Sequence, residues 1–90
     1  MKHYTMKEVK EHSARDDCWI VVEDKVYDIT AFMDSHPGGS SILMSVAGED
    51  VTEHFYALHK PEILQETGSH YHIGYLETYF SKLLGLTPRL

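Results

Sequence analysis

One short motif constrains this chain more than any other: "DSHPGGSSI", residues 34–42. Pro37 biases His36, the residue before it, away from helical geometry and toward an extended backbone. The proline itself has a fixed φ and no amide hydrogen to donate. Gly38 and Gly39 lack Cβ atoms, so a flat ligand can approach the backbone closely. The motif therefore predicts an imidazole at a stiff corner beside a wall free of side chains, which suits metal or haem ligation.

A second histidine, His59, lies at the expected end of a helix that starts near residue 51. Four residues of this segment fall at i, i+3, i+4 and i+7 and so share one helix face: Val51, His54, Phe55 and Leu58. Pro61 predicts that the helix ends by about residue 60. His36 and His59 could then clasp a flat apolar cofactor between two helix pairs. The weaker candidates for the second ligand are His54, His70 and His72.

The first part of the chain predicts a short helix followed by a hairpin. Thr5 and Glu8 have the spacing of a capping box, with Met6 and Val9 on the inner face of the helix that follows. Residues 18–22 form a continuous apolar run and predict a buried strand, in which Trp19 packs in the core and Cys18 is an inert small residue. "EDK" predicts a turn, and residues 26–29 a second strand.

The rest of the chain predicts short helices and a return strand. Thr30 is the expected N-cap of a turn over residues 31–33. Residues 40–47 predict a helix that ends near Gly48, with Ile42, Leu43 and Val46 pointing inward. Residues 61–68 predict a further helix, and "YHIGYL" a strand. The last helix is expected to be packed and to end at Gly85, and its apolar stripe consists of Leu76, Tyr79, Phe80 and Leu83. These elements in series are typical of an α+β fold.

Charge and composition exclude several classes of function. The chain has 90 residues, enough for a single domain over 1–90, with 77–90 as its C-terminal helix and tail. Its net charge is −6, which argues against a nucleic-acid partner. The acidic balance is compatible with a basic protein partner or with a merely solvated surface. No apolar run approaches the ~18–20 residues of a membrane helix. We therefore expect a soluble, cytoplasmic monomer without a membrane anchor in this chain, and the single cysteine fits a reducing compartment.

Four segments of the chain, taken together and in order, resemble the cytochrome b5 family. They are "CWIVVEDKVYDITAFMDS", "HPGG", "AGEDVTEHFYALH" and "IGYL", and the resemblance runs from about Tyr4 to Leu76. It implies that His36 and His59 are the two axial ligands of haem b. It also implies a small mixed sheet as a platform below two helix pairs, 30–46 and 51–68, that form the haem pocket. The other cofactor-binding residues we expect are Phe32, Pro37, Gly38, Leu43, Phe55 and Leu58.

The resemblance and the chemistry agree on electron transfer. No C-x-x-C-H motif is present, so the haem is expected to be held non-covalently. Two axial histidines leave no open iron position, which disfavours oxygen chemistry and favours one-electron transfer. We therefore expect an electron carrier between a reductase and an acceptor protein, not an enzyme. A basic partner is expected to face Glu49, Asp50, Glu53 and Glu62.

Three alternatives remain open at this point. The chain could be the haem module of a larger oxidoreductase, such as a desaturase or reductase fusion, or a haem-binding or ligand-binding regulatory domain. A zinc site is less favoured because structural zinc usually takes four Cys or His ligands at close spacing, and this chain has one cysteine. Lys60, directly after His59, could pair with a haem propionate or point to solvent. His3 and His12 are expected to be ordinary surface residues, and His70 and His72 polar residues at the surface or strand edge.

Overall fold

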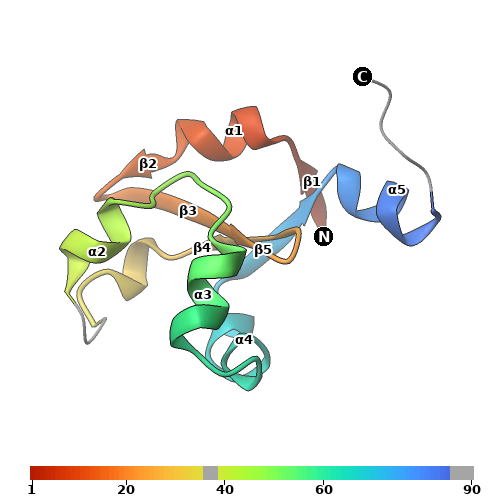
Figure 1. Cartoon of the computed structure of the whole chain (residues 1–90). Coiled ribbons are helices and arrows are strands. Elements are labelled where there is room, and N and C mark those ends of the chain that lie inside the picture. The colour runs from red at the N-terminus through yellow and green to blue at the C-terminus, as the bar shows by residue number, and fades with distance from the viewer. Residues whose placement is uncertain (36–38, 86–90) are drawn as a thin grey trace.

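The computed structural model describes residues 1–35 and 39–85, which form an α+β fold around one sheet (Figure 1). Its five strands lie in the order β1-β5-β4-β3-β2. The strands are β1 (Lys2–Tyr4), β2 (Ser13–Ala14), β3 (Asp17–Val22), β4 (Lys25–Asp28) and β5 (His72–Leu76). The α-helices are α1 (Met6–Glu11), α2 (Ser40–Met44), α3 (Thr52–Leu58), α4 (Glu62–Glu66) and α5 (Thr78–Leu83). Two short 3₁₀ turns, η1 (Thr30–Phe32) and η2 (Gly68–His70), complete the described elements.

The predicted hairpin is confirmed as β3 and β4, which pair antiparallel from Trp19↔Asp28 to Val22↔Lys25. Glu23 and Asp24 connect the two strands with φ values of 52° and 61°. Positive φ at both central residues gives a two-residue turn the twist that antiparallel strands need. The second strand ends at Asp28, so Ile29 lies just beyond it rather than within it.

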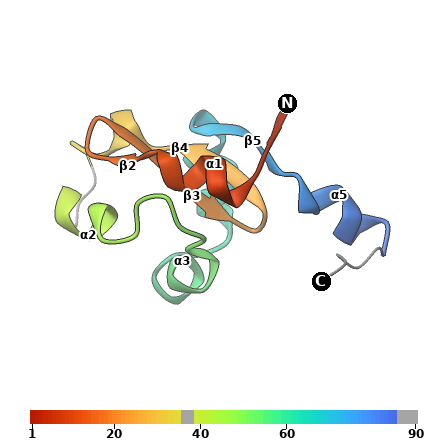
Figure 2. The same cartoon turned by 90° about the horizontal axis from the view of Figure 1, so that it is seen from above.

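The sheet carries a separate hydrophobic core on each face, because side chains of a strand alternate between faces. Ile20 and Val22 belong to one core, together with Tyr27, Ile29 and Met33. Val21 belongs to the other core, which also contains Val9, Val26 and Leu76. Helix α1 covers this second face, whereas α2, α3 and α4 lie on the first (Figures 1 and 2). The sheet thus separates α1 from α2 and α3, which bear the predicted pocket residues Leu43, Phe55 and Leu58.

The capping box at the start of α1 is confirmed. The Glu8 backbone N–H donates to Thr5 Oγ1 at 3.0 Å, and the Thr5 N–H donates to the Glu8 carboxylate at 3.3 Å. Val9 is fully buried beneath the helix, as its spacing predicts. The box also sets where the chain leaves β1, since Thr5 lies between that strand and the helix.

Two helix predictions in the middle of the chain need correction. Thr30 is not an N-cap, because its hydroxyl donates to Asp28 at 2.6 Å and accepts from the Cys18 N–H at 2.9 Å, which ties η1 to the sheet. Helix α2 ends at Met44, so Val46 lies in the following turn. Ile42 is 54% exposed and lines only an open apolar hollow on this face of the sheet. Ser45 Oγ donates to the Ile42 carbonyl at 2.6 Å, a local bond that competes with continuing the helix.

The predicted C-terminal helix is confirmed as α5, but it is less closely packed than expected. Leu76 belongs to β5, and the apolar residues of α5 are only partly covered: Phe80 is 42% and Leu83 63% exposed. The helix contacts the sheet mainly through aromatic rings, with Tyr79 4.6 Å from Tyr75 between centroids. Gly85 does follow the helix, with φ 73°, as expected of a helix-terminating glycine.

Candidate functional site

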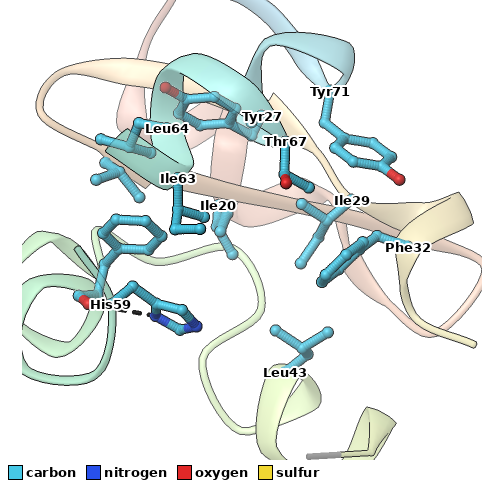
Figure 3. A pocket seen from close by; sticks show the side chains of 13 residues that line it. Ile20, Tyr27, Ile29, Phe32, Leu43, His59, Ile63, Leu64, Thr67 and Tyr71 are labelled. Atoms are coloured by element: carbon cyan, nitrogen blue, oxygen red, sulfur yellow. Dashed lines mark hydrogen bonds between the residues drawn. The ribbon is translucent and has the colours of Figure 1, made fainter. Parts of the chain in front are cut away.

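An apolar cleft lies on the sheet face that carries α2, α3 and α4. Its inner part is a pocket of about 110 Å³, and an outer hollow of about 470 Å³ shares four lining residues with it. The shared residues are Ile20, Leu43, Phe55 and His59. Figure 3 shows His59, Leu43 and Phe32, which come from three different segments, around one gap. The two pockets therefore form one continuous cleft between α2 and the α3–α4 pair.

His59 occupies the place that the sequence predicts, directly after the last residue of α3. Its Nδ1 lies 3.3 Å from the Phe55 carbonyl oxygen (dashed in Figure 3). A carbonyl can only accept, so Nδ1 carries the proton in this bond, and in the neutral ring the free lone pair is then on Nε2. The Phe55 ring stacks on the imidazole, with centroids 4.8 Å apart and planes 19° apart. The ring is thus held in one tautomer and one orientation, which is how proteins commonly present a histidine to a metal.

The other predicted residues of the cleft fall into three groups. Phe32, Leu43 and Phe55 line the inner pocket. Leu58 lines only the outer hollow and is 74% exposed. His36, Pro37 and Gly38 lie outside the described residues, so their roles stay predictions.

Gly39, at the edge of the motif, is described and has φ 85°. A Cβ built there would meet no atom within 4 Å. The glycine is therefore required by its backbone angle, which other residues rarely adopt, and not by a close approach of protein atoms.

One wall of the pocket is formed by α4 and the segment after it. This wall contains none of the cofactor-binding residues predicted from the sequence. It consists of Ile63, Leu64, Thr67, Gly68 and Tyr71. Tyr71 meets Phe32 edge to face across the pocket, with centroids 5.4 Å apart. Ile63 and Leu64 were recognisable as apolar helix residues, but nothing local in "ETGSHY" signals that Tyr71 returns to the pocket.

The sheet supplies the floor of the pocket through Ile20, Val22 and Tyr27. Burial raises the pKa of the Tyr27 phenol to about 12, with smaller contributions from Tyr56 and Tyr75. The phenol is therefore neutral at physiological pH, and the floor carries no charge of its own from this residue. A neutral, apolar floor suits a large uncharged ring system.

Two histidines outside the cleft are more constrained than the sequence predicts. His12 is not an ordinary surface residue: its ring stacks on Trp19 at 3.6 Å and 5°, and its Nδ1 lies 2.7 Å from the Asp17 carboxylate. His72 is half-buried in β5, and its Nε2 lies 2.8 Å from the Gly74 carbonyl. Burial lowers the pKa of His72. Neither His12 nor His72 lines the apolar cleft. Of the candidates for the second ligand, His59 lines both parts of the cleft, and His54 lines only the outer part.

The predicted acidic residues separate into two sets. Asp50 and Glu53 line a polar hollow beside the cleft, together with Glu23 and Asp24 of the hairpin turn. Glu49 and Glu62 are exposed elsewhere on the surface. His54 lines both the polar hollow and the outer part of the apolar cleft, so the two features adjoin.

The residues present fit a b-type haem. The cleft is walled by aliphatic and aromatic side chains, which match the apolar face of a porphyrin. Its lining includes the His59 imidazole, whose Nε2 takes no part in the bond to Phe55. Cys18, the one thiol, is fully buried in the sheet core and faces no cofactor, and burial raises its pKa. The donor that the described part of the cleft offers is the imidazole of His59, and imidazole suits haem iron.

Comparison with known proteins gives the same result. The family model of the cytochrome b5-like heme/steroid binding domain matches residues 5–77. Cytochrome b5 isoform B of Arabidopsis thaliana is 39% identical over 97% of this chain and 66% of its own length. A part of nitrate reductase [NADH] 1 of Oryza sativa subsp. japonica is 48% identical over 86% of this chain and 8% of the reductase. The chain spans between 55% and 66% of the length of the first curated relatives it matches.

A solved structure supports the fold as well. Cytochrome b5 of Ostreococcus tauri virus 2 superposes with a TM-score of 0.75 at 35% identity, over 81% of this chain and 94% of that one. Within residues 1–35 and 39–85, none of the helices combines the length and apolarity needed to cross a bilayer. Sequence family, fold and cleft chemistry agree, and the chain therefore belongs to the cytochrome b5 family of haem-binding domains.

Proposed function

We propose that this domain is a one-electron carrier that holds haem b non-covalently, with His36 and His59 as the axial ligands. The observation that carries the proposal is the state of His59. Its Nδ1–H is used by the Phe55 carbonyl, and the ring lines an apolar cleft with Nε2 unused by that bond. A second axial histidine would leave the iron without an open position, which favours electron transfer over oxygen chemistry.

The chain's own residues have clear tasks in this function. The bound haem supplies the one-electron couple. Phe32, Leu43 and Ile63 line the pocket and would exclude water from a haem held there, which would lower the local dielectric and help to set the reduction potential. Phe55 orients His59 twice, through its carbonyl and through its ring. A fixed ligand ring keeps the geometry of the site similar in both oxidation states, so little reorganisation accompanies each transfer.

Partner proteins are expected to be a reductase and an electron acceptor. Asp50 and Glu53 beside the cleft, and the net charge of −6, support docking on a basic surface. Charge complementarity of this kind mainly raises the association rate. In this role the domain passes electrons and is not itself an enzyme. The predicted cytoplasmic location stays part of the proposal, on the strength of the single unpaired Cys18.

The second candidate function is that of a haem module within a larger oxidoreductase. It is favoured by the match to part of nitrate reductase, and by 40% identity to part of Delta(5) fatty acid desaturase A of Dictyostelium discoideum, of which the match covers 17%. Both roles use the same chemistry and differ only in whether the donor or acceptor is covalently joined. We propose that residues 1–90 fold as one unit in either role, with 77–90 as the C-terminal helix and tail.

The test is the absorption spectrum of haem-loaded protein in both oxidation states. We expect six-coordinate, low-spin bands for the wild type, and their loss in His36→Ala and His59→Ala because each change removes one axial ligand. His70→Ala, in an exposed part of η2, is the matched control and should keep the wild-type bands. Low-spin bands that survive His59→Ala would eliminate it as a ligand. A loaded protein without a reversible one-electron couple would favour the regulatory alternative instead.

A further inference from the structure

The polar hollow beside the haem cleft is formed by three segments that are distant in the sequence. They are the β3–β4 turn, the start of α3, and α5, which lies beyond the end of the sheet away from α2 (Figures 1 and 2). The hollow has a volume of about 420 Å³. Its lining residues are Glu23, Asp24, Asp50, Thr52, Glu53, His54 and Lys82. Four carboxylates thus surround a single ammonium group, that of Lys82.

Lys82 is already bound to one of these carboxylates. Its Nζ lies 3.0 Å from both carboxylate oxygens of Asp24, across 58 residues of sequence. The Asp24 side chain is only 17% exposed, whereas Lys82 is 60% exposed. The backbone of Asp24 is bound to β5, since its carbonyl accepts the Leu76 N–H at 2.8 Å. Asp24 is therefore the more buried member of the pair, with its backbone bound to the sheet, and Lys82 is the more exposed member.

Two of the other carboxylates have partners within the body of the domain. Asp50 accepts from the Thr52 hydroxyl at 2.6 Å and from its N–H at 3.1 Å. Burial raises the pKa of the Tyr56 phenol, and so do the charge of the Glu23 carboxylate and the hydrogen bond that Glu23 accepts from that phenol. Asp24 differs from both, because the partner of its carboxylate comes from α5, a helix whose apolar residues are largely exposed.

We propose that α5 is a strap that masks an acidic docking surface, and that a cationic side chain of the redox partner competes with Lys82 for Asp24. This regulation rests on the proposed electron-carrier function. His54 connects the two features, because it lines both the polar hollow and the outer part of the haem cleft. A partner that displaces Lys82 would therefore dock directly beside the mouth of the cleft. The seated ammonium of Lys82 defines the chemistry of the partner group as a lysine or arginine side chain.

A metal ion is a poorer occupant of the hollow. Among residues 1–35 and 39–85, no three His, Cys, Asp or Glu side chains converge closely enough to hold one. The carboxylates are spread over two segments, and Asp50 is already engaged by Thr52. Spread carboxylates match a protein surface that carries several cationic groups better than they match one small ion.

The experiment compares two substitutions that break the same ion pair from opposite sides. Lys82→Ala removes the competing cation, and Asp24→Asn removes its acceptor. Binding of a tetralysine peptide to the haem-loaded protein is followed at low salt by NMR shifts of the backbone amides of residues 23, 24 and 50–54. Amide hydrogen exchange of α5 is measured on the same samples. Lys7→Ala, an exposed lysine on α1, makes the same change in net charge and is the control.

We expect the two substitutions to change the affinity for tetralysine in opposite directions and to change the hydrogen exchange of α5 in the same direction. Lys82→Ala should bind tetralysine about two- to fivefold more tightly than Lys7→Ala, the range that an exposed ion pair supports. Asp24→Asn should bind it more weakly than wild type, and α5 should exchange faster in both variants. Equal affinities for Lys82→Ala and Lys7→Ala, or peptide shifts away from the hollow, would overturn the strap. Because this readout involves no electron transfer, the strap and the electron-carrier function can fail independently.

Discussion

The stack of Phe55 on His59 allows a quantitative prediction about haem retention. Phe55 is half-buried, lines both parts of the cleft and lies parallel to the imidazole at 4.8 Å. In Phe55→Ala, the ring is removed while the backbone carbonyl that accepts from His59 Nδ1 remains. The substitution therefore separates the contribution of the ring from that of the hydrogen bond.

The magnitude follows from the burial and the stack. A fully buried aromatic side chain removes ~150–250 Å² from water, and half of that at ~25 cal/mol/Å² is worth about 2.5 kcal/mol of haem-free stability. An aromatic pair contributes about 0.5–1.5 kcal/mol beyond its area, which corresponds to an increase of about 2- to 13-fold in haem loss. We therefore expect faster haem loss in addition to a lower unfolding midpoint.

The assay is the decay of the haem absorption band when loaded protein is mixed with an excess of a haem-scavenging apoprotein. Phe80→Ala is the matched control, because it deletes the same ring from α5, which contributes no residue to the cleft. It should leave the rate of haem loss unchanged. Equal rates for Phe55→Ala and wild type would show that the Phe55 ring does not contribute to haem retention.

Two further predictions concern the sheet. In Gly74→Ala, the new Cβ would lie 2.4 Å from the Lys2 carbonyl oxygen and 2.6 Å from the Tyr4 ring, so β1 must shift. We expect the free energy of unfolding in urea to fall by about 1–3 kcal/mol. An unchanged midpoint would show that β1 shifts without a loss of stability. Tyr27 has its pKa raised to about 12, so the native state holds a proton that the unfolded chain releases above pH ~10. Unfolding free energy should therefore fall between pH ~10 and 12, by at most about 2.7 kcal/mol, and Tyr27→Phe should remove that part of the slope in urea titrations.

Much of the local structure could be predicted because its causes are local. The capping box at Thr5 and Glu8 needs only residues three apart, and the apolar run at 18–22 needs only the preference of buried strands. The position of His59 at the end of α3 likewise follows from the helical spacing of residues 51–58 and from Pro61. These signals placed the predicted pocket residues Phe32, Leu43 and Phe55 on elements that do converge on the cleft.

Local signals failed where a polar side chain had a better partner elsewhere. Thr30 has the composition of an N-cap, yet its hydroxyl bonds to Asp28 and Cys18, because β3 brings the Cys18 N–H within reach. His12 looked like a surface residue, but β3 places Trp19 and Asp17 against it. In both cases the competing partner becomes available only after the sheet has formed.

The α+β class, the hairpin and the order of the short helices could be derived from the sequence, and the sequence predicts His59 as a haem ligand. The pairing of β1 with β5, the contact of Tyr71 with Phe32 and the ion pair of Lys82 with Asp24 became visible only in the folded domain. The difference lies in the range of the interactions. Periodicity, capping and turn preferences act over a few residues, whereas these contacts join segments that meet only when the sheet closes and both of its faces are covered.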